Sequence, residues 1–124
     1  MPVAYWCILI AALLPLVWVS YAKAGARHNN TPRDDAENLA GAKRRAYAAH
    51  QNAYENFPFF AVAVMAALSF GASPGAVDWL AVLYIIFRIA HGLLYAADKA
   101  GLRSAAYTGA LLVNISIFVI PAFR

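Results

Sequence analysis

In this 124-residue sequence, the residue whose type and position most clearly indicate chemistry is an arginine in the middle of an apolar stretch. Arg88 lies within residues 76–97, which are otherwise mostly apolar. An unpaired arginine at the centre of a bilayer costs about 2.5–3.5 kcal/mol on insertion scales, so the sequence must compensate it. At 100° per residue, Tyr84, His91 and Tyr95 lie within about 60° of Arg88 on a helix. These four residues predict one polar stripe that faces protein or water.

A carboxylate that could neutralise Arg88 lies in the preceding apolar region. Asn52 and Glu55 are three residues apart and share a helix face, with Arg45 two turns earlier on the same side. A buried carboxylate and guanidinium can form a bidentate pair, so we expect Glu55 to pair with Arg88. The alternative is that this pair only locks two helices together, with Asn52 and His91 as satisfied interior groups. Ionisable residues inside a membrane mark functional sites by default, which favours a site.

Four apolar segments must position these residues, at about 3–22, 53–71, 76–97 and 105–123. The chain is 63% hydrophobic and 13% charged, whereas about a quarter of the residues of a soluble domain are charged. About 20 apolar residues suffice to cross a hydrocarbon core. The residues before the second segment are rich in helix formers, so that helix should extend out of the membrane. The sequence predicts an all-α, integral membrane four-helix bundle forming a single domain over residues 1–124.

Lysine and arginine are concentrated in the two loops that follow the first and third segments. The positive-inside rule places these loops in the cytoplasm and both termini on the other side. With loops this short, we expect a bacterial inner membrane. The topology explains the net charge of +4, so no nucleic acid partner is expected. No metal site is expected either, because His28, His50 and His91 have no cysteine or carboxylate at ligand spacing.

Two stretches resemble a known family of membrane proteins. The run R-A-Y-A-A-H-Q-N-A-Y-E-N-F-P-F, from Arg45 to Phe59, resembles the signature of the MAPEG family, the membrane-associated proteins in eicosanoid and glutathione metabolism. In that signature an asparagine and a glutamate three residues apart precede a proline. The stretch from Arg88 to Tyr95, followed by Arg103, Ser104, Tyr107 and Thr108, looks like the corresponding part of the microsomal prostaglandin E synthases. The likeness covers nearly the whole chain.

The resemblance implies a homotrimer that binds glutathione between neighbouring subunits, near the cytoplasmic side. The glutathione-binding residues that it implies are Arg45, Asn52, Glu55, Arg88, His91 and Tyr95. It also implies that Arg103 lies at the glutathione thiol and that Ser104 adds a hydrogen bond to the sulfur, so these two are the candidate catalytic residues. A guanidinium beside a thiol of ordinary pKa about 8.5 favours the reactive thiolate.

We therefore expect a glutathione-dependent transferase or peroxidase that acts on small lipophilic electrophiles arriving from the membrane lipid. The alternative is a non-catalytic protein that keeps the MAPEG fold and binds a lipid or another ligand. Ala48 favours this alternative, because characterised members carry an arginine seven residues before the glutamate. A transporter or channel is disfavoured, because no pair of glycine- or proline-broken helices occupies corresponding positions. The sequence leaves open the electrophile and whether the reaction is conjugation, peroxide reduction or isomerisation.

Overall fold

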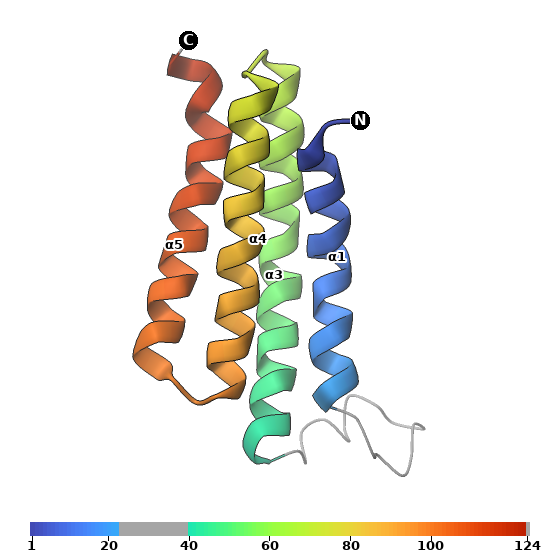
Figure 1. Cartoon of the computed structure of the whole chain (residues 1–124), viewed down its shortest axis with the longest axis vertical. Helices are drawn as coiled ribbons and strands as arrows, with labels where there is room; N and C mark the ends of the chain where they lie inside the picture. Colours follow the sequence, from blue (N-terminus) through green and yellow to red (C-terminus); the bar gives the residue numbers. More distant parts are fainter. Residues whose placement is uncertain (23–39, 124) are drawn as a thin grey trace.

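The computed structural model describes residues 1–22 and 40–123, which form a bundle of long helices that run up and down side by side (Figure 1). The helices are α1 (Val3–Ala22), α3 (Gly41–Ser69), α4 (Pro74–Ala96) and α5 (Ala100–Val119), followed by a short 3-10 helix, η1 (Ile120–Phe123). The described residues contain no strand. The predicted all-α bundle is confirmed, and both termini lie at one end of it, opposite the α4–α5 connection (Figure 1).

Three segments of the described chain are long and apolar enough to cross a membrane: α1, α4 and the continuous stretch Ala100–Phe123. Helix α3 lies alongside them but is not in this group, because polar residues occupy its N-terminal half. Its 29 residues give a length of about 43 Å, more than the roughly 30 Å of a hydrocarbon core. The span expected at residues 53–71 stays a prediction.

Small side chains bring the helices together. The buried core contains many alanines, among them Ala4, Ala11, Ala63 and Ala81. Alanines at helix contacts let the backbones approach closely, which is how helices associate without a hydrophobic driving force in lipid. The most extensive contacts are those between α4 and α5 and between α1 and α3. The helix rotations at these contacts decide which polar residues face inward.

One aromatic pair fixes α3 against α4. The rings of Phe60 and Tyr84 stack with their centroids 4.0 Å apart and their planes only 8° from parallel. Phe60 is fully buried, and Tyr84 is nearly so. Because Tyr84 belongs to the predicted polar stripe, this stack turns the stripe towards α3.

Glycine and proline end one helix and begin the next. At the end of α3, Gly71 adopts a φ of 84°. The Ala72 N–H donates to the Ala67 carbonyl at 2.9 Å, and the Gly71 N–H donates to the Leu68 carbonyl at 3.2 Å. This is the Schellman arrangement, which satisfies helix-terminal carbonyls and needs a residue at positive φ. Pro74 then begins α4, where its missing N–H costs nothing.

Asp78 of α4 caps the start of α1. Its Oδ1 accepts a hydrogen bond from the Ala4 N–H at 2.8 Å, satisfying one of the donors that the first turn of a helix leaves free. We expect Asp78→Ala to lower the free energy of unfolding by about 1 kcal/mol. Asp78→Asn keeps an oxygen acceptor and should lose less. Thermal unfolding in detergent, followed by circular dichroism, measures both, and an unchanged midpoint for Asp78→Ala would contradict the cap.

Candidate functional site

A polar cavity of about 330 Å³ opens between α3, α4 and α5. Its lining residues are Asn52 from α3, His91 and Tyr95 from α4, and Arg103, Ser104, Tyr107 and Thr108 from α5. The part of the lining that the described residues form includes a cationic side chain and no carboxylate. Such a surface is suited to a ligand that carries negative charge and hydrogen-bond acceptors.

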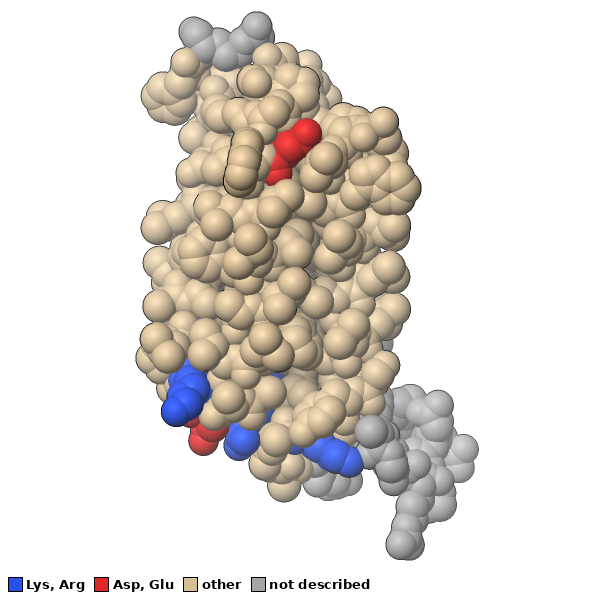
Figure 2. Space-filling model, viewed as in Figure 1, with Lys and Arg blue, Asp and Glu red and all other residues tan. Residues whose placement is uncertain are grey.

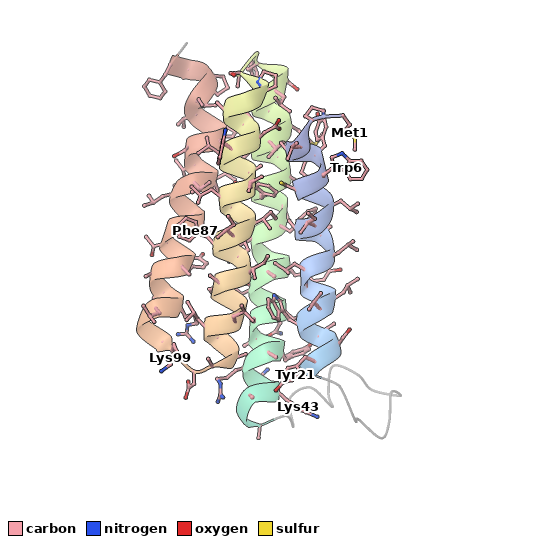
Figure 3. All side chains as sticks on the ribbon, in the orientation of Figure 1. Met1, Trp6, Tyr21, Lys43, Phe87 and Lys99 are labelled. Carbon is pink, nitrogen blue, oxygen red and sulfur yellow. The ribbon has the colours of Figure 1, made fainter. Side chains whose placement is uncertain are left out.

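The cavity lies towards the basic end of the bundle. Tyr95 and Arg103 flank the connection between α4 and α5. Figure 2 shows lysine and arginine side chains at this end of a face that is otherwise mostly uncharged. The labelled Lys43 and Lys99 lie at the same end, opposite Met1 and Trp6 (Figure 3). The surrounding positive charge attracts anions towards the cavity.

The predicted polar stripe on α4 faces the protein interior. Arg88 and His91 are only 4% and 3% exposed, and Tyr84 is buried beside them. The Arg88 Nη2 donates a hydrogen bond to Asn52 Oδ1 at 2.7 Å. The stripe and its contact with α3 are thus confirmed in geometry.

The partner predicted for Arg88 is wrong in this structure. Glu55 is exposed on the outside of α3, and Arg88 bonds instead to Asn52. Residues three apart on a helix differ in direction by about 60°, so a rotation that turns Asn52 towards α4 turns Glu55 away from it. Within residues 1–22 and 40–123, no ion pair joins Glu55 to Arg88.

Arg45 also lies away from the cavity. Its Nε and Nη2 donate to the Ala96 carbonyl at 3.4 and 3.2 Å. This carbonyl is in the last turn of α4, where backbone acceptors have no partner in the helix and a positive charge is favourable. Arg45 therefore caps α4 and is not among the residues that line the cavity, and its role in glutathione binding stays a prediction.

Aromatic rings hold the remaining site residues. The Arg103 guanidinium carbon lies 4.4 Å from the centroid of the Tyr95 ring, a cation–π contact. His91 packs edge-on against Tyr95, with centroids 5.6 Å apart, and lies 6.0 Å from the Tyr107 ring. These contacts bring Arg103 of α5 and His91 of α4 to one cavity.

Sequence reasoning missed Tyr107 and Thr108 as site residues. Both line the cavity, and the Thr108 hydroxyl donates to the Ser104 carbonyl at 3.0 Å. Their spacing could have indicated them. Tyr107 and Thr108 follow Arg103 and Ser104 by four residues each, so they lie one turn further along the same helix face. Both belong to the stretch that carries the family resemblance.

One buried polar group lies outside this site. Asn114 of α5 is 2% exposed, and its Oδ1 has no hydrogen-bond partner among the described residues. Within residues 1–22 and 40–123, no three histidine, cysteine or acidic side chains lie close enough together to hold a metal ion.

Fold and site together define a helical membrane protein with a donor-rich cavity near one end of its bundle. The family model for the MAPEG family matches residues 3–123, and the chain belongs to this family. It is accordingly an integral membrane protein, consistent with its apolar helices. The comparison with curated proteins found no match.

Proposed function

We propose that this chain is a membrane-bound, glutathione-dependent transferase or peroxidase that acts on lipophilic electrophiles. The observation that carries the proposal is the polar cavity inside a largely apolar bundle, to whose lining the residues at 1–22 and 40–123 contribute Arg103 and no carboxylate. Glutathione has the complementary chemistry, since it carries two carboxylates, two peptide groups and a thiol. Membership of the MAPEG family supports this choice.

The proposed chemistry centres on Arg103. A guanidinium close to the thiol stabilises the thiolate, which is the nucleophile in conjugation and in peroxide reduction. Ser104, the next residue on α5, lines the cavity and offers a hydroxyl to the sulfur. Asn52, His91 and Tyr95 line the cavity as well and would hold the tripeptide. Arg88 acts from behind Asn52 rather than from the lining.

We extend the proposal to a homotrimer on the strength of the exposed Glu55. An exposed carboxylate on a helix within a membrane bundle is costly in contact with lipid. A second copy packed against this face of α3 would give Glu55 polar partners. The lipophilic substrate would reach the site laterally from the bilayer.

The charge distribution supports an orientation. The basic end would lie in the cytoplasm by the positive-inside rule, with the two termini on the opposite side of a bacterial inner membrane. Cytoplasmic glutathione would then meet the cavity from the positively charged end, while the electrophile would arrive from the lipid.

The direct test uses the full chain purified in detergent. Calorimetry should show glutathione binding with a dissociation constant in the range of about 1 μM to 1 mM, which is usual for enzyme substrates. A chlorinated nitroaromatic substrate and an organic hydroperoxide then test conjugation and peroxide reduction. Absence of both heat and turnover in a folded protein would reject the proposal.

A non-catalytic ligand-binding protein is the second candidate, and the position of Arg45 favours it. Family members with established glutathione chemistry carry an arginine where this chain has Ala48, and Arg45 is committed to the Ala96 carbonyl. Native mass spectrometry distinguishes the two functions. A lipid retained by the protein, without glutathione binding, would favour the second candidate.

A further inference from the structure

Arg88 is a buried cation that contacts neither the cavity nor the reacting thiol of the proposed function. It is 4% exposed, and it does not line the cavity. A guanidinium carries five N–H donors and no acceptor, so whatever it contacts must accept. Its hydrogen-bond acceptor among the described residues is Asn52 Oδ1, at 2.7 Å.

This contact decides which end of the Asn52 amide faces the cavity. An amide side chain has one accepting oxygen and one donating NH₂ group, and either can face a ligand unless a neighbour orients it. Arg88 can only donate, so the oxygen must face Arg88. Asn56 Nδ2 also approaches the same oxygen, at 3.4 Å, so both of its lone pairs are engaged.

The NH₂ group of Asn52 is therefore the part left for a ligand. Asn52 is half-buried and lines the cavity. Within the described chain, no residue accepts a hydrogen bond from its Nδ2. Because this NH₂ group is already oriented, ligand binding loses little free energy to its reorganisation. If the ligand offers no acceptor, the NH₂ group stays unpaired, which disfavours binding.

We propose that Arg88 is a positioning residue that fixes Asn52 as a hydrogen-bond donor, so that the site selects ligands which place a carbonyl or carboxylate oxygen at this point. The inference rests on the proposed function, in which glutathione supplies that oxygen. Arg88 acts through Asn52 and does not itself contact the ligand. Its charge adds to the attraction that Arg103 exerts on the same ligand.

A double-mutant cycle tests whether Arg88 works through Asn52. Glutathione affinity is measured by calorimetry for the parent chain, Arg88→Met, Asn52→Leu and the double variant. Asn52→Leu should weaken binding about tenfold, since a donor to a charged or polar group is lost. Arg88→Met should weaken binding several-fold in the parent and by less than about twofold in the Asn52→Leu chain, because coupled residues are non-additive. Equal losses in both backgrounds would overturn the inference.

Two further variants keep the inference testable if Arg88→Met fails to fold. Arg88→Lys keeps a donor and a charge, so it should retain most of the affinity. Asn52→Asp pairs well with Arg88 but presents no donor, so it should bind glutathione at least as poorly as Asn52→Leu while unfolding at an unchanged or higher temperature. Gln51→Glu is the matched control, because it adds the same charge at the adjacent, exposed position. Parent-like affinity in Asn52→Asp would overturn the inference.

The pattern of results separates this inference from the proposed function. A parent chain that binds no glutathione rejects the proposed function and, with it, the ligand assigned to Asn52. A parent chain that binds and turns over glutathione, with additive losses in the cycle, rejects only the role of Arg88.

Discussion

Replacing Arg103 with alanine is expected to lower the turnover of glutathione with an electrophile about 100-fold, since one electrostatic group aimed at developing charge contributes 10²–10³ in rate. Glutathione affinity should fall far less, because Asn52, His91 and Tyr95 still line the cavity. The stacked Tyr95 ring, 4.4 Å from the guanidinium carbon, holds Arg103 in place before the ligand arrives. Steady-state kinetics together with calorimetry separate the two effects.

The pH profile distinguishes thiolate stabilisation from a general loss of structure. If Arg103 stabilises the thiolate, its removal shifts the rise of the rate with pH to higher pH, and Arg103→Lys should restore part of the rate. Lys99→Ala is the matched control, because it removes one positive charge from an exposed site one turn earlier. A rate for Arg103→Ala that equals the rate for Lys99→Ala would remove Arg103 from the reaction.

The apolar segments predicted from the sequence match two of the helices closely and miss the start of a third. The segment predicted at residues 3–22 coincides with α1. The segment predicted at 76–97 agrees with α4, Pro74–Ala96, to within two residues at each end. Helix α5, however, begins at Ala100 rather than near residue 105. Its N-terminal residues include Arg103 and Ser104, which are polar and therefore lie outside the predicted apolar segment. Backbone hydrogen bonds define a helix, whereas apolar composition marks only where lipid surrounds it.

The error over Glu55 has a specific physical origin. Periodicity fixes the angles between residues on one helix, but the rotation of that helix against its neighbours depends on packing. The buried stripe of α3 includes Ala49, Ala53 and Phe60, and at 100° per residue Glu55 points about 160° away from Ala53. Asn52 lies closer to the stripe. The stripe of alanine and phenylalanine residues therefore predicts the rotation of α3 that places Asn52, and not Glu55, towards α4.

Contacts with backbone carbonyls were beyond sequence reasoning. Arg45 bonds to the carbonyl of Ala96, and His50 Nδ1 lies 2.9 Å from the carbonyl of Pro15. Every residue has a backbone carbonyl, so the sequence does not indicate which carbonyl will accept a hydrogen bond from a given side chain. By contrast, Arg103 and Tyr95 were predicted to share a site, because the resemblance specified both positions.

The largest loss of stability is expected from Gly92→Ala. A Cβ at this position of α4 would overlap the indole ring of Trp18 in α1. Overpacking of this kind costs about 1–3 kcal/mol, which exceeds the gain of up to about 1 kcal/mol that alanine brings to a helix interior. Gly92 is buried next to His91, so the Trp18 ring must shift at the contact between α1 and α4 to admit the methyl group.

Gly101→Ala is the matched control for this prediction. A Cβ at Gly101 in α5 meets nothing within 4 Å, so the same substitution should stabilise the protein by about 0.5–1 kcal/mol through helix propensity and the unfolded state. Thermal unfolding in detergent should therefore move in opposite directions for the two variants. Trp18→Leu in the Gly92→Ala chain should recover much of the loss, because the smaller side chain frees the space that the new methyl group needs. If Gly92→Ala and Gly101→Ala shifted the midpoint alike, the close contact of α1 with α4 beside His91 would be refuted.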